Sequence, residues 1–287
     1  MGIRTDLMIE HTAFAKEITP DGITRNVIQK GHVTVTRIVV ETEQAAQRLE
    51  KPQGRYLTLE MDSLKGYSGQ FEQEVELIGK EISPLLPKEG LIFVVGLGNS
   101  QITPDDIGPH TCRYVLATRH LINGIAEQTG LDMLRPVAVA APGVLGQTGM
   151  ETVEIVAGIC QKIKPAAVVV VDALAARDIN RLGRTIQISD TGIVPGSGVQ
   201  NRRKELSVHT LGVPVIAIGV PTVVDMATIA SDLLQTNNQI PDRAKTMMVT
   251  PREIDQIVAQ SSKMLAMGLN CALQPELSVS ELMGLTA

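Results

Sequence analysis

Carboxylates follow two apolar segments that are typical of buried strands. Asp172 ends the apolar run at 166–172 (AAVVVVD). Asp105 and Asp106 lie in the loop after the apolar run at 91–95 (LIFVV). A carboxylate that ends an apolar strand is costly to bury unless it is paired or functional. Two such groups facing one another can have separated pKa values, so the pattern predicts a general acid and a general base near neutral pH.

Each of these acids also has a structural interpretation. Acidic residues just before a helix commonly cap it or offset its dipole, which would explain Asp105 and Asp106. Asp172 would similarly cap the turn at 174–178. The residue pattern leaves these alternatives open, and it does not choose between Asp105 and Asp106.

A glycine-rich loop with a basic cluster forms a third candidate site. The loop at 192–198 (GIVPGSG) is followed by Arg202, Arg203 and Lys204. Backbone N–H groups and cationic side chains of this kind bind an anion or an acidic peptide. A solvated charged turn is the alternative interpretation.

Other common chemistries are not supported by the residue spacing. The Gly-Leu-Gly at 96–98 lacks the third glycine of a dinucleotide fingerprint, because Gln101 stands there, so we expect a tight strand-exit turn instead. The histidines show no HExxH, the three cysteines show no CxxC, and no GxSxG occurs. We therefore expect no metal and no cofactor.

Composition excludes several classes of protein. Of 287 residues, 44% are hydrophobic and 20% are charged, which excludes disorder. A net charge of −5 and an aromatic content of 2% argue against direct nucleic-acid binding. The longest apolar run, 213–224, contains Pro214 and is too short to span a membrane, and the charged N-terminus does not resemble a signal peptide. We expect a cytoplasmic protein with no membrane partner.

The elements that must position these residues fall into two groups. Strands are predicted at 33–40 and 56–60, with helices at 43–50 and 72–83, whereas residues 1–30 show no clean period. The remainder predicts a mostly parallel sheet flanked by helices, because short apolar runs alternate with helical stretches. The apolar runs are 91–95, 137–140, 166–171, 185–188 and 213–218, the helical stretches are 108–128, 149–163 and 225–234, and a C-terminal helix follows at 251–268. The sequence thus predicts an α/β fold with an extra N-terminal β segment and a site at the carboxyl ends of the strands.

Four segments closely resemble the germination proteases of endospore-forming bacteria. They are VVGLGNSQITPDDIGP (94–109), APGVLGQTGMET (141–152), VVDALAARDINRLGRTIQISDTGIVPGSGVQNRRKE (170–205) and LGVPVIAIGVPTVVD (211–225). The resemblance covers most of residues 1–235. It implies an atypical aspartic-type endopeptidase that degrades small acid-soluble spore proteins, is made as a self-processing zymogen, and forms a homotetramer in the forespore or spore core. It also implies a core like that of the hydrogenase-maturation endopeptidases.

The resemblance assigns the catalytic pair and the domain plan. It places the first catalytic aspartate at Asp105 rather than Asp106, and the second at Asp172. It implies a single peptidase domain over 1–287, with a candidate propeptide at 1–6, a catalytic core at 91–235 and a C-terminal helix at 248–270. One departure is the short segment between Leu234 and Val249, where family members carry a long insertion.

The resemblance also implies a self-processing site at Asp6-Leu7. The family's substrates are cut after an acid and before an apolar residue, in a segment that ends with a second acid. Residues 5–10 (TDLMIE) have this pattern. We expect this N-terminal backbone to be extended and accessible to the cleft, and the basic cluster Arg202, Arg203 and Lys204 to attract its acids. A frayed terminus without a role is the alternative.

Two rival functions remain open at this point. A hydrogenase-maturation-type endopeptidase would be metal-dependent, with a histidine downstream of the second carboxylate, and no histidine lies between Asp172 and His209. A non-catalytic protein that binds an anion or a peptide in its glycine-rich loops belongs to a different class. Such a protein would keep its affinity without Asp105 and Asp172, whereas a peptidase would lose its turnover.

Overall fold

The computed structural model describes residues 5–12, 21–62, 64, 69–122, 134–196, 203–234 and 241–286. Its strands are β1 (Ile23–Lys30), β2 (Val33–Val40), β3 (Gly54–Glu60), β4 (Ile92–Gly96), β5 (Val137–Ala140), β6 (Ala167–Ala176), β7 (Thr185–Ser189), β8 (Val215–Asp225) and β9 (Met248–Val249). Its helices are α1 (Met8–Thr12), α2 (Glu43–Leu49), α3 (Phe71–Ile82), α4 (Ile107–Cys112), α6 (Leu145–Thr148), α7 (Thr152–Ile163), α8 (Val208–Leu211), α9 (Met226–Leu234), α10 (Ile254–Leu273) and α11 (Val279–Thr286).

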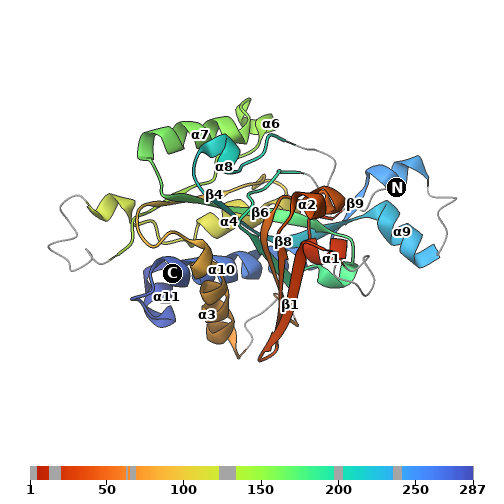
Figure 1. The fold of residues 1–287 in the computed structure, drawn as a ribbon, viewed down its shortest axis with the longest axis horizontal. Helices are drawn as coiled ribbons and strands as arrows, with labels where there is room; N and C mark the ends of the chain where they lie inside the picture. Colours follow the sequence, from red (N-terminus) through yellow and green to blue (C-terminus); the bar gives the residue numbers. More distant parts are fainter. Residues whose placement is uncertain are drawn as a thin grey trace.

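The strands form one mixed sheet in the order β1-β2-β3-β7-β8-β6-β4-β5, with β9 paired to β8. The pairs β4–β5, β4–β6 and β6–β8 are parallel and make up the core of the sheet. The pairs β1–β2 and β2–β3 are antiparallel and extend it on one side. Figure 1 shows α7 and α8 on one face of the sheet and α3, α10 and α11 on the other. The predicted α/β fold with an added N-terminal β segment is confirmed.

The direction of β7 differs from the prediction. The run at 185–188 was expected among the parallel strands, but β7 is antiparallel to both of its neighbours, β3 and β8. A parallel return needs a crossover of a dozen or more residues, usually a helix. The connection at 177–184 has no room for one. The strand β7 therefore joins the antiparallel N-terminal part of the sheet to the parallel core.

Two apolar cores lie on opposite faces of the sheet. In β4, Ile92 and Val94 belong to the core that includes Leu265 of α10. The alternate residues Phe93 and Val95 pack with α7 on the other face. Successive strand residues point to opposite faces, and here both faces are covered, which explains the continuous apolar runs of the parallel strands.

Two further elements differ from their predictions. The strand β1 was not predicted, because it lies at the edge of the sheet and only Ile23 of its residues is buried. The predicted helix at 108–128 ends at Cys112. Asn270 of α10 accepts a hydrogen bond from the Leu116 N–H and donates one to the Tyr114 carbonyl, so it binds backbone groups that a continuing helix would use. Residues 123–128 lie outside the described ranges.

The remaining predicted helices are present close to their expected positions. The C-terminal helix α10 begins later and ends later than 251–268, because residues 251–253 form its entry turn. Within the described residues, no helix is long and apolar enough to cross a membrane.

Candidate active site

A cavity of about 590 Å³ lies beyond the carboxyl end of β4, against residues 172–175 of β6. Asp105 and Asp172 line it, and so does Asp6. The expectation that Asp172 ends its strand was wrong, because β6 continues to Ala176, but Asp172 does lie just beyond the last residue of β6 that pairs with β4. Most of the remaining lining is apolar, including Leu97, Ile102 and Leu174. The structure therefore brings three carboxylates from distant parts of the chain into one largely apolar cavity.

Glycine at position 98 allows the loop after β4 to fold back and place Asp105. Gly98 has φ +120°, and a Cβ there would lie 1.9 Å from the carbonyl oxygen of Asp105. The Leu97 N–H donates to the Val171 carbonyl at 2.8 Å, which ties the start of the loop to β6. The expected tight turn is therefore present, and it requires glycine.

The end of the same loop is fixed by Gly108, in the first turn of α4. A Cβ at this position would lie 2.2 Å from the Leu97 carbonyl oxygen and 2.4 Å from that of Val171. The amino end of α4 thus packs directly against the ends of β4 and β6. Asp105 is held between two close backbone contacts, so its position is set by rigid elements.

The Asp105 carboxylate is partly desolvated and hydrogen-bonded. Its Oδ2 accepts a hydrogen bond from the Asn99 N–H at 2.8 Å. Burial raises the pKa of Asp105 above its ordinary value, the Asn99 N–H opposes that rise, and the negative charge of Asp106 adds to it. The Asn99 side chain accepts a hydrogen bond from Gln147 at 2.7 Å, which fixes this part of the cavity wall.

The Asp172 carboxyl is the more deeply buried of the pair, with 6% of the residue exposed. Its Oδ1 accepts a hydrogen bond from the Ala173 N–H at 2.9 Å. Burial raises the pKa of Asp172 well above its ordinary value, and the negative charges of Asp105 and Asp6 raise it further. The pKa values of both carboxyls are therefore raised, that of Asp172 more strongly than that of Asp105, so Asp172 is the group that holds a proton more readily.

Asp106 does not line the cavity. Its Oδ2 lies 3.6 Å from Nδ1 of His110, one helical turn away in α4. The structure thus separates two adjacent acids that residue spacing alone left equivalent, and only Asp105 faces the cavity.

The basic cluster is divided by the fold. Arg203 lines the cavity, and its N–H donates to the Pro195 carbonyl at 3.1 Å. Lys204 is exposed and lies outside the cavity, with its Nζ 3.6 Å from Oε1 of Glu154. Arg202 lies outside the described residues. Of the three candidate residues, the described part of the chain thus places only Arg203 at the site.

The N-terminal segment lies along the part of β6 that extends beyond the end of β4. The Asp6 N–H donates to the Ala175 carbonyl, and the Ala175 N–H donates to Oδ2 of Asp6, both at 2.9 Å. The expectation of an extended, accessible backbone was wrong beyond Asp6, because Leu7 and Met8 are fully buried and α1 begins at Met8. Leu7 fills an apolar cluster with Leu174 and Val224, and that burial draws the segment onto the sheet.

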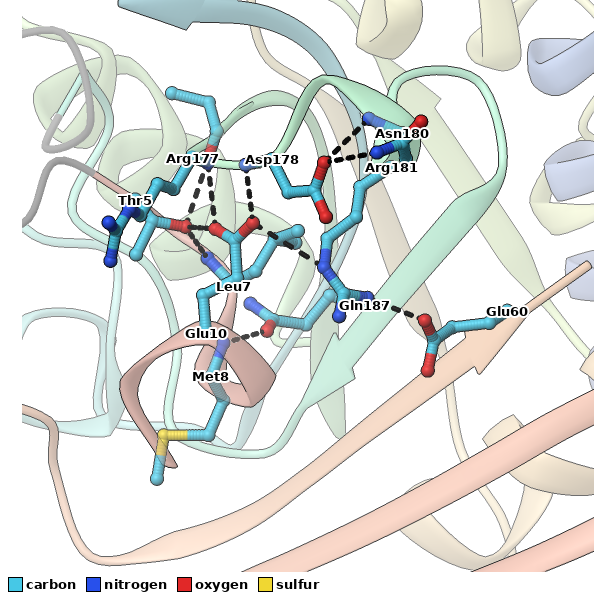
Figure 2. A network of polar contacts seen from close by, with 11 residues as sticks. Thr5, Leu7, Met8, Glu10, Glu60, Arg177, Asp178, Asn180, Arg181 and Gln187 are labelled. Atoms are coloured by element: carbon cyan, nitrogen blue, oxygen red, sulfur yellow. Dashed lines mark hydrogen bonds and ion pairs between the residues drawn. The ribbon is translucent and has the colours of Figure 1, made fainter. Parts of the chain in front are cut away.

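Two side chains that the sequence did not single out bind the carbonyl of Asp6. The oxygen accepts hydrogen bonds from Nε2 of Gln187 at 2.9 Å and from Nζ of Lys51 at 3.2 Å. The Gln187 Oε1 accepts a hydrogen bond from the Met8 N–H (Figure 2). One carboxamide thus binds the backbone on both sides of Leu7. No motif marks these residues, because each contact joins positions far apart in the chain.

The sheet register aligns Gln187 of β7 with Asp172 of β6, with one residue of β8 between them. Asp172 pairs with Gly219 of β8, and Gly219 pairs with Gln187 of β7. Residues aligned across a sheet point to the same face. The Gln187 side chain, which binds the Asp6 carbonyl, therefore points to the same face of the sheet as the Asp172 carboxyl.

Comparison with known proteins identifies related chains over nearly the full length. The sequence profile of the germination proteases matches residues 5–237. The germination protease of Clostridium tetani (strain Massachusetts / E88) is 38% identical, with 98% of this chain and 98% of that protein covered. The germination protease of Clostridium perfringens (strain SM101 / Type A) is 40% identical, again with 98% of each chain covered.

A solved structure shows a weaker likeness. The [NiFe] hydrogenase maturation protease HycI from Thermococcus kodakarensis KOD1 is 16% identical, with a TM-score of 0.37. The comparison covers 66% of this chain and 98% of that one.

The buried Asp172 carboxyl gives a prediction about stability. Because its pKa is raised in the folded protein, the folded state keeps a proton that the unfolded state loses above about pH 4, so this group destabilises the fold increasingly as pH rises towards its raised pKa. Asp172→Asn removes this effect. We expect its melting temperature to exceed that of the wild type at pH 8, by about 2–4 °C for each 1 kcal/mol gained.

Thermal unfolding from pH 5 to pH 8 measures this difference. Asp62→Asn, at an exposed aspartate, is the matched control and should follow the wild type. An Asp172→Asn variant that is less stable than the wild type at pH 8, with the same pH dependence, would contradict the buried, protonated state of Asp172.

Proposed function

The chain belongs to the germination protease family, and on that premise we propose that Asp105 and Asp172 are its catalytic pair. Membership makes the protein a protease of spore germination. The observation that supports the pair is the cavity that both carboxylates line, Asp105 from the loop after β4 and Asp172 from the adjacent parallel strand β6. The remaining candidate, Asp106, does not line that cavity.

The different surroundings of the two carboxyls give each a role. Asp105 accepts a hydrogen bond from the Asn99 N–H and is less buried than Asp172. It therefore carries the negative charge of the pair and acts as the general base. Asp172 is deeply buried and keeps its proton, so it acts as the general acid. A pair that shares one proton in this way supplies both functions near neutral pH.

The reaction is a hydrolysis in which water attacks the scissile carbonyl carbon. Asp105 takes one proton from the water as the oxygen–carbon bond forms. Asp172 gives its proton to the departing amide nitrogen as the carbon–nitrogen bond breaks. The products are a carboxylic acid and an amine, and transfer of one proton between the two aspartates restores the pair.

Substitution of either aspartate tests the assignment. Asp105→Asn and Asp172→Asn should each fold and lose peptidase activity by about 100-fold or more, because each removes one proton-transfer group. The measurement is the cleavage rate of a purified small acid-soluble spore protein. Asp106→Asn is the matched control and should retain most of the activity, and full activity in either variant of the pair would overturn the assignment.

The finer properties implied by the resemblance form part of the same proposal. The substrates are small acid-soluble spore proteins, which the protein degrades in the spore core after its own activation from a zymogen. Arg203, at the cavity, is the member of the basic cluster best placed to meet an acidic substrate segment. The assembly is a homotetramer, and nucleic acid is not a direct partner.

Self-processing at Asp6-Leu7 is supported by the position of that bond. Asp6 lines the cavity with the catalytic pair, and its carbonyl oxygen accepts hydrogen bonds from Gln187 and from the Lys51 ammonium group. Donors at this oxygen stabilise the negative charge that develops there during attack by water. The chain thus places Asp6, on the amino side of this bond, in the cavity that Asp105 and Asp172 line.

Processing gives a second direct test. We expect residues 1–6 to be lost when the zymogen is acidified or partly dehydrated, leaving a new N-terminus at Leu7. Intact mass measurement and N-terminal sequencing follow the reaction, and Asp172→Asn should remain at full length. Cleavage at another bond, or cleavage that persists in Asp172→Asn, would rule out this processing site.

Metal independence separates the proposal from the hydrogenase-maturation-type alternative. Among the described residues, no group of three or more His, Cys, Asp and Glu side chains is placed to hold a metal ion. Asp105 and Asp172 supply the base and the acid without one. We therefore expect a chelator to leave the cleavage rate within about twofold of the untreated protein. Activity that disappears with the chelator and returns with added metal would favour the alternative.

A further inference from the structure

Within the described part of the chain, one side of β6 has no partner strand beyond the end of β4. The last pair between these two strands is Gly96 with Val171, whereas β6 continues to Ala176 and stays paired with β8 on its other side. A free strand edge offers backbone N–H and C=O groups that can pair with another extended segment. Residues 172–175 of this edge line the cavity of the proposed catalytic pair.

The backbone groups of Ala173 and Ala175 face this free side of β6. Backbone groups along a strand alternate between its two sides, and the Val171 carbonyl, on the β4 side, accepts the Leu97 N–H at 2.8 Å. Every second residue after Val171 therefore faces the same side. Among the described residues, no backbone N–H from outside the helices and strands donates to the Ala173 carbonyl.

Asp6 occupies the free side while the N-terminal segment is intact. Its N–H donates to the Ala175 carbonyl as a paired strand would, and its Oδ2 accepts the Ala175 N–H in the place of a strand carbonyl, both at 2.9 Å. The Thr5 hydroxyl lies 3.4 Å from the same carbonyl. Thr5 and Asp6 both belong to residues 1–6, so loss of these residues frees the N–H and the C=O of Ala175, while the buried Leu7 stays in the fold.

We propose that the free side of β6 at residues 173–175 is a strand-pairing site for an extended segment of a protein substrate. The segment lies on the amino side of the bond to be cut, and it takes the place that residues 1–6 leave. This inference rests on the proposed cleavage at Asp6-Leu7. It names the backbone groups that bind the substrate, which are the Ala173 carbonyl and the N–H and C=O of Ala175.

The pairing also fixes the register of the substrate. In the intact chain the Asp6 carbonyl accepts hydrogen bonds from Gln187 and Lys51. Gln187 also binds the Met8 N–H, and Met8 remains in the fold after processing, so the carboxamide keeps its orientation. A substrate residue that pairs with Ala175 as Asp6 does therefore brings its own carbonyl to the same two donors.

Strand pairing selects the conformation of the substrate backbone. Main-chain hydrogen bonds supply the affinity, so the segment must be extended and must have a free N–H group that reaches the Ala175 carbonyl. Loss of one such hydrogen bond corresponds to a decrease in binding of about 10-fold.

Three hexapeptides with the sequence of residues 1–6 and a C-terminal amide test the site. The first is unmodified, and the second has an ester in place of the Thr5-Asp6 peptide bond, so it lacks the Asp6 N–H. The third is the matched control, with an ester at the Arg4-Thr5 bond, because the next N–H along an extended segment points away from β6. Titration calorimetry with the processed protein should show the second binding about 10-fold more weakly than the first, and the third within about twofold of the first. The unprocessed protein should bind none of them, because Asp6 already occupies the edge.

Intact mass measurement before the titration separates this inference from the proposed function. If the protein has lost residues 1–6, equal binding of the first two peptides, or no binding of the first at millimolar concentration, would overturn the strand-pairing site and leave the processing unaffected. Equal binding of the first peptide by processed and unprocessed protein would overturn it as well. A protein that keeps residues 1–6 under the activating conditions would overturn the proposed cleavage itself. All changes are made in the peptide, so folding of the protein is the same in every comparison of peptides.

Discussion

Burial of the Asp172 carboxyl within β6, just beyond the end of β4, is the constraint on which the rest of the site depends. The Asp172 residue is 6% exposed, and its burial together with the negative charges of Asp105 and Asp6 raises the pKa of its carboxyl well above the ordinary value. The backbone is built to allow this proximity. Gly98 and Gly108 let the loop after β4 approach β6 to distances that a side chain would forbid.

The same extension of β6 beyond β4 explains why the N-terminal segment lies at the site. Once β4 has ended, the Ala175 backbone has no strand on that side, and Asp6 takes the place of one. Burial of Leu7, and hydrogen bonds from the Arg177 and Asp178 N–H groups to the Glu10 carboxylate, hold the segment from its other end. Because β7 runs antiparallel to β8, Gln187 aligns with Asp172 across Gly219 and binds the Asp6 carbonyl. Strand β7, which joins the antiparallel part of the sheet to the parallel core, therefore also carries the side chain that binds the N-terminal segment.

The sequence predicted the parts of the site that depend on local patterns. An apolar run ending in Asp172 indicates a buried carboxylate on its own, and the resemblance to a family was needed to prefer Asp105 to Asp106. The direction of β7 and the end of α4 at Cys112 were missed because connection length and a distant side chain, Asn270, decide them. Contacts of Lys51 and Gln187 with Asp6 were missed for the same reason, since no periodicity or motif encodes a contact between distant segments.

The protonation states of the two aspartates are the central claim, and they can be observed directly. Carboxyl carbon shifts of protein labelled with ¹³C-aspartate can be followed from pH 4 to pH 8, with Asp105→Asn and Asp172→Asn used to assign the signals. We expect the signal of Asp172 to remain that of a protonated carboxyl at neutral pH, while Asp105 is ionised. Removal of the Asp105 charge should lower the pKa of Asp172. Two carboxyls that ionise together at the ordinary pKa of aspartate, with no effect of either substitution on the other, would contradict the shared-proton pair.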